Sequence, residues 1–544
     1  MKIVVIGGVA AGAGAATKAR RTDETAEIVL LEKGGYVSFA NCGLPYYIGG
    51  VIEDRDELLL VSPELFRERF NIDVRLHNEV TDIDAAGKTV TVKTPEGVAT
   101  ESYDKLVIAT GGRPVMLPIP GNDKGGVYTV FTVPDADAIM AWLARGLRSA
   151  VVVGGGFIGL ETAENLNARG LDVTLVEKLP QLMSSMDPEF SEVMAGEFNS
   201  LGIDVITGVG VSEITGGDSA DGVILEDGRK LSADLVIMAA GVKGSTELAQ
   251  KAGCRLGESG GVWVDAGMRT SVPDIFAAGD ITECVNLVTG KKVRNPLAGS
   301  ANKQGRVAGA NAAGGNMRFP GALGTSILKV GGLIAARTGL NTREAEAAGL
   351  DFECLYVPGF SHATYYPDAA PLVLKLTVER QTGRLLGAQG IGRSGVDKRI
   401  DVLATAIYGH MTVFDLENLD LAYTPPFGSA KDPVVIGGMI AANVVRGEVE
   451  SCLPQDIPAL LADPDTAVLD VRTREEWDAG HVEGAALLPV DELRSRLGEL
   501  DKTKTYAIYC GVGYRAYVAC LILKAYGFRA KNISGGWRAI TMKV

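Results

Sequence analysis

Cysteine and histidine are scarce in this chain of 544 residues. None of the four histidines is spaced as a metal-binding pair, and no CxxC motif occurs. The seven cysteines lie at positions 42, 254, 284, 354, 452, 510 and 520. Because their number is odd and their spacing irregular, we expect no disulfide framework and no metal site. We also expect a reducing, cytoplasmic setting.

Positive charge and long apolar runs are lacking as well. Lysine and arginine total 53 against 67 aspartates and glutamates, a net charge of -14, which argues against a general nucleic-acid-binding surface. No apolar run reaches the roughly 18 residues that suggest a membrane span. Nothing before the first strand-like run, KIVVIGG, resembles a secretion signal. We therefore expect no nucleic-acid partner and no membrane association.

Glycine, in contrast, is abundant, with 69 residues. Many glycines stand beside runs of valine and isoleucine, which is typical of nucleotide-binding turns. At roughly 100–200 residues per domain, the length predicts three or four domains.

A strand, a glycine turn, an alanine-rich helix and a second strand occur twice in the chain. The first copy is KIVVIGGVAAGAGAATKARR followed by AEIVLLEK, and the second is SAVVVGGGFIGLETAENLNARG followed by LDVTLVEK. Short β-branched runs of this kind are expected of buried parallel strands. The repeat predicts two Rossmann-like α/β units, each able to bind a dinucleotide.

The second glycine motif is complete, with Gly154, Gly156 and Gly159 in the order GxGxxG. Its glycines permit a tight turn, close approach of a pyrophosphate, and packing of the helix on the strand. Glu177 ends the next strand, where a carboxylate binds an unphosphorylated ribose and repels a 2′-phosphate. This unit is therefore predicted to prefer NADH to NADPH.

The first motif departs from this pattern. Gly7 and Gly12 match, but Val9 occupies the middle position, so a plain glycine-rich turn is an alternative. Glu32, followed by Lys33, ends the next strand and favours a dinucleotide site.

Two further segments complete a family pattern. YDKLVIATGGRP contains Thr110 and Gly111, and TSVPDIFAAGD ends on Asp280. The order of the four motifs resembles the flavoprotein reductases with two dinucleotide-binding domains, the pyridine nucleotide-disulfide oxidoreductases. The resemblance covers residues 1–445 and implies FAD at the first unit, with Asp280 on its ribityl chain, and NADH at the second. Two unrelated Rossmann units are the alternative.

The resemblance also implies the domain order of the α/β chain. The segment PLVLKLTVERQTGRLLGAQGIG predicts an antiparallel meander, with helices near 396–420 and 432–446. A linker is expected near 447–456. The implied domains are an FAD-binding domain (1–120 and 246–325), an NAD-binding domain (121–245), an α+β dimerisation domain (326–446) and a C-terminal α/β domain (456–544).

Cys42 is the candidate redox centre. It lies in SFANCGLPY, which looks like coenzyme A-disulfide reductases and their persulfide-reducing relatives. With no second cysteine nearby, it would cycle through a mixed disulfide, a sulfenic acid or a persulfide. A small buried hydrophobic residue is the alternative role for this cysteine.

The same resemblance implies a coenzyme A site and a homodimer. Tyr423 and Tyr365, which matches best by its spacing to Tyr423, would reach the cysteine of the other subunit. The adjacent Tyr366 is the alternative to Tyr365, and each tyrosine could simply pack at an interface. Lys18 replaces a more usual polar residue of the family. The positions implied for coenzyme A are Lys18, Arg21, Ser38, Asn41, Arg306 and Lys431.

Residues 456–544 resemble a rhodanese domain. In YCGVGYRA, Cys510 follows a strand, and the loop to Arg515 has the length seen in sulfur-handling members. Backbone N–H groups of such a loop stabilise a thiolate or persulfide. An inert scaffold is the alternative, and Cys520 is expected in the core. Other matching positions are Asp470, Arg472, Glu476, His481, Gly511 and Gly513.

Together these features predict an NADH-dependent flavoprotein that reduces coenzyme A persulfides, polysulfides or coenzyme A disulfide through Cys42. The rhodanese-like segment suggests sulfane sulfur as the cargo. An NADH oxidase or peroxidase that uses a Cys42 sulfenic acid is one alternative. A redox sensor whose C-terminal domain binds a partner is another.

Overall fold

The computed structural model describes residues 1–542 and 544. It divides into two compact units, Met1–Ser184 with Phe198–Gly324, and Ser185–Glu197 with Thr325–Val544. The finer domain limits expected from the sequence stay a prediction. Across the described residues, every helix is too short or too polar to cross a membrane.

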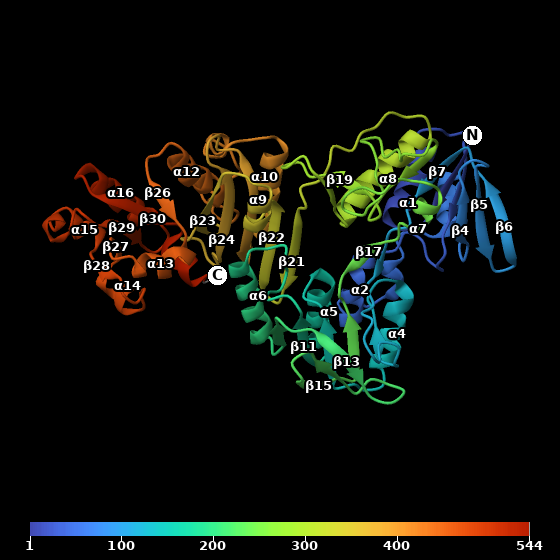
Figure 1. Cartoon of the computed structure of the whole chain (residues 1–544), viewed down its shortest axis with the longest axis horizontal. Coiled ribbons are helices and arrows are strands. Elements are labelled where there is room, and N and C mark those ends of the chain that lie inside the picture. The colour runs from blue at the N-terminus through green and yellow to red at the C-terminus, as the bar shows by residue number, and fades with distance from the viewer. Residues whose placement is uncertain (543) are drawn as a thin grey trace. The chain divides into compact units, whose positions relative to one another are not determined.

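The first unit contains two five-stranded parallel sheets, one for each copy of the sequence repeat (Figure 1). The strand orders are β18-β7-β1-β2-β3 and β12-β11-β10-β16-β9. Their central strands are buried on both faces, which explains the uninterrupted valine and isoleucine runs. The strands of the first sheet are β1 (Lys2–Ile6), β2 (Glu27–Leu31), β3 (Asp73–Arg75), β7 (Lys105–Ile108) and β18 (Ile275–Ala277). Those of the second are β9 (Val127–Tyr128), β10 (Ser149–Val153), β11 (Asp172–Glu177), β12 (Asp204–Thr207) and β16 (Leu235–Met238).

Helices and small antiparallel sheets complete this unit. Helix α1 follows β1, and α5 follows β10, as the repeat predicted. The helices are α1 (Ala10–Arg20), the 3-10 turn η1 (Asn41–Gly43), α2 (Leu44–Gly49), η2 (Arg55–Leu58), α3 (Pro63–Phe70), α4 (Val133–Leu143), α5 (Phe157–Ala168), α7 (Glu247–Lys251) and α8 (Ala298–Ala312). The small sheets are β4 (Glu79–Asp84), β5 (Thr89–Thr94) and β6 (Gly97–Ser102); β8 (Gly112–Pro114) and β17 (Val242–Gly244); β13 (Val211–Thr215), β14 (Gly222–Leu225) and β15 (Lys230–Ser232); β19 (Glu283–Val285) and β20 (Lys292–Arg294).

The second unit is built on an antiparallel five-stranded sheet in the order β21-β22-β25-β24-β23. The predicted meander is its β24–β25 pair, and the predicted helices are present. The strands are β21 (Ser326–Val330), β22 (Leu333–Gly339), β23 (Phe352–Phe360), β24 (Pro371–Glu379) and β25 (Leu385–Gly392). The helices are α6 (Pro188–Ser200), α9 (Thr342–Ala347), α10 (Val396–Tyr408), α11 (Val413–Leu416) and α12 (Pro433–Val445).

The C-terminal domain of this unit has a parallel sheet in the order β26-β30-β29-β27-β28. Strand β26 falls inside the predicted linker and pairs with β30, so the connection from α12 is shorter than expected. Its three residues are too few to show a strand period. The strands are β26 (Glu450–Cys452), β27 (Thr466–Asp470), β28 (Ala486–Leu487), β29 (Thr505–Tyr509) and β30 (Arg529–Ile533). The helices are η3 (Pro454–Asp456), α13 (Ile457–Ala462), α14 (Arg474–Asp478), α15 (Val490–Leu493), η4 (Leu497–Glu499), α16 (Tyr514–Ala525) and α17 (Gly536–Thr541).

The predicted fold class is confirmed. Both Rossmann-like units, the α+β domain and the C-terminal α/β domain are present.

Candidate active sites

The two glycine turns of the first unit have nearly the same geometry. A Cβ atom on Gly7 would lie 2.3 Å from the carbonyl oxygen of Ala109, and one on Gly12 would lie 1.7 Å from that of Gly7. The matching distances for Gly154 and Gly159 are 2.3 and 1.9 Å. Any side chain at these four positions would displace backbone atoms, so close packing of helix on strand requires glycine.

The middle position differs between the turns. Gly156 is exposed at the start of α5, and no atom lies within 4 Å of a Cβ built there. Packing within the protein therefore does not require a glycine at this position, whereas close approach of a pyrophosphate would explain it. Val9 stands at the matching position before α1.

A glutamate anchors each glycine turn to the strand that follows the helix. Glu32 accepts hydrogen bonds from the backbone N–H groups of Gly8 and Gly34, at 2.8 and 2.7 Å. Glu177 accepts a matching bond from Gly155 at 2.6 Å. Each carboxylate has lone pairs left over for a ribose hydroxyl.

The other predicted cofactor residues lie at the ends of β7 and β18. The Thr110 hydroxyl donates to the carbonyl oxygen of Ser245 at 2.7 Å, and the Gly111 carbonyl oxygen accepts from the N–H of Ser245 at 2.9 Å. The Asp280 carboxylate makes no hydrogen bond within the described part of the chain, and burial raises its pKa. It is thus a free acceptor for a polar ligand. Lys33 is exposed beside Glu32.

Cys42 lies at the surface in η1, immediately before α2. The Asn41 side-chain oxygen accepts the N–H of Cys42 at 3.1 Å and lies 3.7 Å from its sulfur. The N–H of Ser38 donates to the carbonyl oxygen of Gly8 at 2.8 Å. This bond ties the segment from Ser38 to Cys42 to the first glycine turn, so predicted coenzyme A residues and the thiol share one turn.

Two residues that the sequence analysis did not single out lie near this thiol. Glu161, on α5, accepts a hydrogen bond from the Tyr46 hydroxyl, on α2, at 3.2 Å. Burial raises the pKa of the Cys42 thiol, and the carboxylates of Glu161 and Asp280 raise it further. Burial and Glu161 also raise the pKa of Tyr46 to about 12. The signal available in the sequence was only the position of Glu161 two residues after Gly159.

The predicted phosphate-binding residues of the first unit lie on two packed helices. Lys18 and Arg21 lie at the end of α1, and Arg306 lies on α8, which packs against α1 (Figure 1). Arg21 and Arg306 are exposed, so a basic surface is available to an anionic ligand. Lys431 is exposed in the second unit, before α12.

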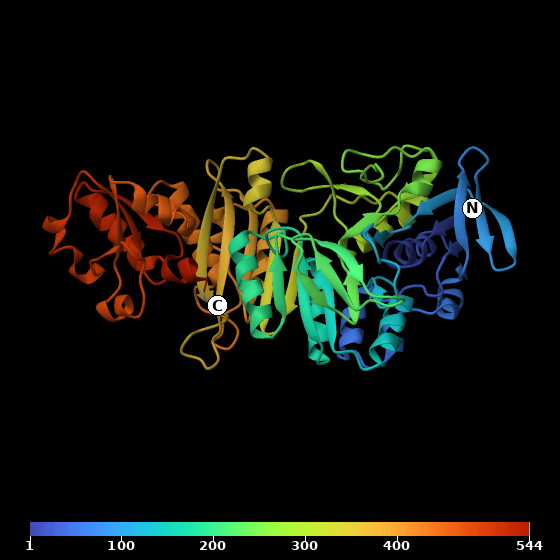
Figure 2. The same ribbon diagram turned by 60° about the horizontal axis from the view of Figure 1, so that its bottom comes forward.

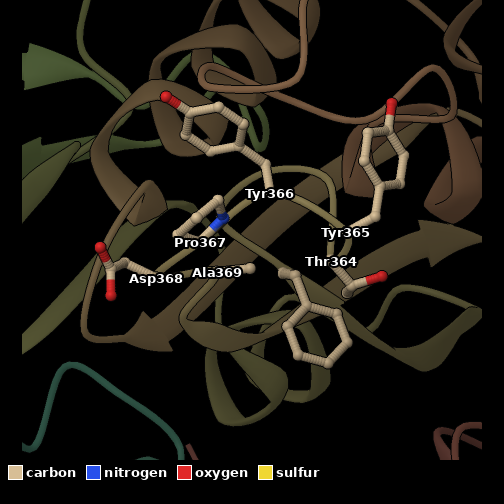
Figure 3. Close-up of a pocket in the computed structure, with 7 residues that line it drawn as sticks. Thr364, Tyr365, Tyr366, Pro367, Asp368 and Ala369 are labelled. Carbon is tan, nitrogen blue, oxygen red and sulfur yellow. The ribbon is translucent and has the colours of Figure 1, made fainter.

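The candidate tyrosines separate into a pair and a single residue. The hydroxyl groups of Tyr365 and Tyr423 are 2.7 Å apart, and both side chains are exposed. Tyr366 instead packs edge-on against His362, with ring centres 5.7 Å apart. Residues 364–369 and Phe360 line a pocket of about 400 Å³. Figure 3 shows the rings of Tyr365 and Tyr366 pointing away from each other beside it. This geometry favours Tyr365 as the partner of Tyr423.

A buried arginine holds the two tyrosine loops together. Arg399, on α10, donates to the carbonyl oxygen of Ser361 and to the carboxylate of Asp432, both at 2.8 Å. The N–H of Ala363 donates to the carbonyl oxygen of Gly428 at 3.0 Å. The paired hydroxyls therefore rest on loops with a rigid base.

Cys510 directly follows β29 and is only 1% exposed. The N–H of Gly513, at the start of α16, donates to its sulfur at 3.2 Å. Arg515 follows and forms two hydrogen bonds with the Glu476 carboxylate, at 2.7 and 2.6 Å. This ion pair lowers the pKa of Glu476 to about 2. The loop is shaped to stabilise an anionic sulfur, and Cys520 lies in the core as expected.

Helix α17 closes the back of this loop. The N–H of Trp537 donates to the carbonyl oxygen of Cys510 at 2.7 Å, and the N–H of Arg538 donates to that of Gly511 at 3.0 Å. The backbone of the loop is therefore fixed from two sides.

Hydrogen bonds from residues in and around α17 and η3 fasten the C-terminal domain, the red part at the left of Figure 2, to strand β23. The N–H of Tyr356 donates to the Ser534 hydroxyl at 2.8 Å, and the Gln455 side chain donates to the Tyr356 hydroxyl at 2.6 Å. The Arg538 guanidinium donates to the carbonyl oxygen of Gly359 at 3.3 Å. These bonds fix the domain against the antiparallel sheet.

A buried ionic cluster lies beneath this contact. Lys375 is 3% exposed and pairs with Asp187 at 2.7 Å and with Glu189 at 2.6 Å. Glu189 also accepts a hydrogen bond from Tyr356. The two carboxylates and Tyr356 hold the pKa of Lys375 above its usual range despite burial. Removing one partner would leave a buried charge uncompensated, so the cluster fixes β23, β24 and the start of α6.

Comparison with known proteins places this chain. Residues 1–305, more than half of the chain, match the family model described as pyridine nucleotide-disulphide oxidoreductase. The chain belongs to this family. The dimerisation domain of pyridine nucleotide-disulphide oxidoreductases matches residues 326–433, and a rhodanese-like domain matches residues 453–543.

Several relatives of this oxidoreductase are informative. A Pyrococcus abyssi protein named NAD(P)H sulfur oxidoreductase (CoA-dependent) is 36% identical over 439 residues, which cover 80% of this chain and 96% of its own. The structure of reduced Bacillus anthracis CoADR-RHD has a TM-score of 0.96 and 40% identity, covering 99% of this chain and 97% of its own. The structure of an NAD-dependent persulfide reductase from A. fulgidus has a TM-score of 0.92 and 41% identity, covering 99% and 100%. The predicted resemblance is confirmed.

The family uses FAD and NAD(P)H, and the residues present fit both. The unpartnered, half-buried Asp280 carboxylate suits a hydroxyl-bearing flavin chain. The open space beside Gly156 suits a pyrophosphate.

Proposed function

We propose that this oxidoreductase is an NADH-dependent, FAD-containing reductase of coenzyme A persulfides, polysulfides and coenzyme A disulfide. The observation that carries the proposal is the lone exposed thiol of Cys42, tied through Ser38 to the first glycine turn. The other cysteines of the first unit, Cys254 and Cys284, are buried in its core. Cys42 therefore has no cysteine partner there for an internal disulfide, and its redox partner is the substrate sulfur.

The chain's residues would bind the coenzyme A phosphates, attack the substrate sulfur and protonate the leaving thiolate. The cations of α1 and α8, Lys18, Arg21 and Arg306, would bind the coenzyme A phosphates. The thiolate of Cys42 would attack the terminal sulfur of R–S–SH, forming one S–S bond and breaking another, so that R–S⁻ leaves.

The tyrosine pair would donate the proton that the leaving R–S⁻ takes up. A single hydrogen bond joins the hydroxyl groups of Tyr365 and Tyr423, so the pair can hold a proton at a fixed place between the two oxygens. We propose a homodimer in which this pair serves the Cys42 of the other subunit, which the match to a dimerisation domain supports.

The first glycine turn, Glu32, Lys33, Thr110, Gly111 and Asp280 would hold FAD, and the second turn with Glu177 would hold NADH. When bound, FAD would relay two electrons from the nicotinamide to the sulfur carried by Cys42, releasing sulfide and the free thiolate. The free state of all seven cysteines suits a reducing compartment such as the cytoplasm.

Cys510 would carry sulfane sulfur on the rhodanese-like domain. Because Tyr356, Ser534 and Gln455 fasten this domain to the antiparallel sheet, large movements of Cys510 would break buried bonds. A flexible thiol such as the coenzyme A arm is therefore the better carrier between the two cysteines.

A side-by-side comparison of four electron acceptors tests the proposed function. NADH oxidation by the purified protein is measured with coenzyme A persulfide, coenzyme A disulfide, polysulfide and oxygen. The persulfide should give the highest kcat/KM. Fast oxygen-dependent turnover without a sulfur substrate would instead indicate an oxidase, and negligible turnover with every acceptor would indicate a sensor.

The NADH preference has its own test. Glu177→Gln keeps an acceptor for the turn but removes the charge that would face a 2′-phosphate, so NADPH use should improve about tenfold. Glu32→Gln, in the matching position of the first unit, should leave the NADPH-to-NADH ratio unchanged. Equal use of both nucleotides by the wild type would contradict the role of Glu177.

A further inference from the structure

The arginines around the Cys510 loop are committed to partners within the protein. Arg515 is neutralised by its two hydrogen bonds to Glu476. Arg472, which is 3% exposed, is neutralised by the fully buried carboxylate of Asp470 at 2.7 Å. Each of these two arginines therefore forms an ion pair without net charge, and the Arg515 guanidinium also interacts with the Cys510 sulfur itself.

The third arginine points away from the sulfur. The Arg538 backbone supports Gly511, but its guanidinium donates to Gly359 and lies over the ring of Phe360, 4.6 Å from the ring centre. On the loop itself both members of the Arg515–Glu476 ion pair are close, because a Cβ on Gly511 would lie 3.4 Å from an Arg515 nitrogen and 3.7 Å from a Glu476 oxygen. A dianion approaching Cys510 would therefore meet an ion pair without net charge, whereas the uncompensated Arg538 guanidinium is turned toward Gly359 and Phe360.

The rim of the loop is apolar. Val512 is 41% exposed and Tyr514 is 72% exposed, although both flank a sulfur that is almost completely buried. Exposed valine and tyrosine side chains beside a reactive thiol offer contact area to an uncharged organic stem.

We propose that the Cys510 loop takes sulfane sulfur from organic persulfides with an uncharged stem and discriminates against sulfur oxyanions such as thiosulfate. This rests on the proposed sulfur-reductase function and narrows its donor. Transfer of a dianion from water into a site without a compensating cation is unfavourable, whereas an uncharged stem loses little hydration.

The transfer balances without an external oxidant or reductant. The Cys510 thiolate attacks the terminal sulfur of R–S–SH, the new S–S bond replaces the old one, and the proton goes to the departing R–S⁻. The persulfide anion left on Cys510 takes the hydrogen bond from Gly513.

The test uses the full-length FAD-loaded protein with Cys42→Ser, in which the reductase step is silent. Pantetheine persulfide, which has an uncharged stem, and thiosulfate are supplied at equal concentrations. Sulfur on the peptide that carries Cys510 is followed by alkylation and mass spectrometry, with Cys510→Ser added as the blank. Pantetheine persulfide should load Cys510 about a hundredfold faster than thiosulfate, because the site lacks a free cation.

A gain-of-function variant makes the test specific. Val512→Arg places a cation on the exposed rim and should raise thiosulfate loading about tenfold, whereas Val512→Ala should not raise it. Equal loading by the two donors, no response to Val512→Arg, or no loading by pantetheine persulfide would each overturn the proposal. Reduction of persulfides by the Cys510→Ser protein tests the Cys42 function separately, so the two failures are distinguishable.

Discussion

Cys42 lies exposed in a 3-10 turn before a short helix, whereas Cys510 is buried in a loop before a long one. The two sulfurs also differ in the charges around them, because among the described residues the carboxylates near Cys42 are not ion-paired with an arginine, whereas Glu476 near Cys510 is. Cys42 lies within electrostatic range of the carboxylates of Glu161 and Asp280. Cys510 receives a backbone N–H and has Arg515 beside it.

Accessibility of the sulfur and stabilisation of its negative charge are therefore separate properties at Cys42 and Cys510. The chain's own residues disfavour a thiolate at Cys42 and leave it accessible, so its reactivity depends on what binds beside it. At Cys510 they supply a hydrogen-bond donor to the sulfur but enclose it. The first site suits attack on varied sulfur substrates, and the second suits holding one sulfur atom.

Replacing each cysteine should give the largest contrast. Cys42→Ser should lower NADH-dependent persulfide reduction by roughly a thousandfold or more, because the nucleophile is lost. FAD content and reduction by NADH should remain. Cys510→Ser should leave reduction of preformed small persulfides nearly intact and impair turnover only when sulfur must first be loaded from a donor. If Cys510→Ser abolished every activity, the two sites would form one catalytic cycle.

The tyrosine pair should matter to one site only. Tyr365→Phe and Tyr423→Phe should each lower persulfide reduction by about a hundredfold through loss of the proton donor. The matched control, Tyr366→Phe, should change it little, and sulfur loading of Cys510 should be unaffected in all three. Mixing Cys42→Ser with Tyr423→Phe subunits should restore activity if the pair serves the other subunit. A fully active monomer would contradict that arrangement.

The glycine turns were predictable because their constraints are local. Gly7 with Gly12, and Gly154 with Gly159, are held in contact by a single strand–helix connection, so spacing alone identifies them. The loop from Cys510 to Arg515 could be predicted for the same reason, because its constraints are also local. The antiparallel meander was visible in the alternation of polar and apolar residues.

Contacts between distant segments could not be predicted. Glu161 approaches Tyr46 from 115 positions away, and Lys375 pairs with Asp187 from 188 positions away. The bond between Tyr356 and Ser534 spans 178 positions. No spacing rule in one sequence connects such residues, so the charge around Cys42 and the attachment of the C-terminal domain needed the structure.

The carboxylate beside Cys42 should produce the smallest effect. Because Glu161 raises the pKa of the Cys42 thiol, Glu161→Gln should lower that pKa. The thiolate would then form at a lower pH. Titration of the thiolate absorbance in the Cys510→Ser background measures the shift. Glu164→Gln, which changes a neighbouring carboxylate, is the control and should shift it less.

The most direct test of the central claim is to locate the sulfur. The Cys510→Ser protein, with its thiols reduced by dithiothreitol and its FAD left oxidised, is freed of reductant under anaerobic conditions and given one equivalent of coenzyme A persulfide. After alkylation and digestion, mass spectrometry should find one added sulfur on the peptide that carries Cys42, and fresh NADH should release it as sulfide. If NADH released sulfide although no sulfur had been found on Cys42, the claim that Cys42 carries the sulfur would be contradicted.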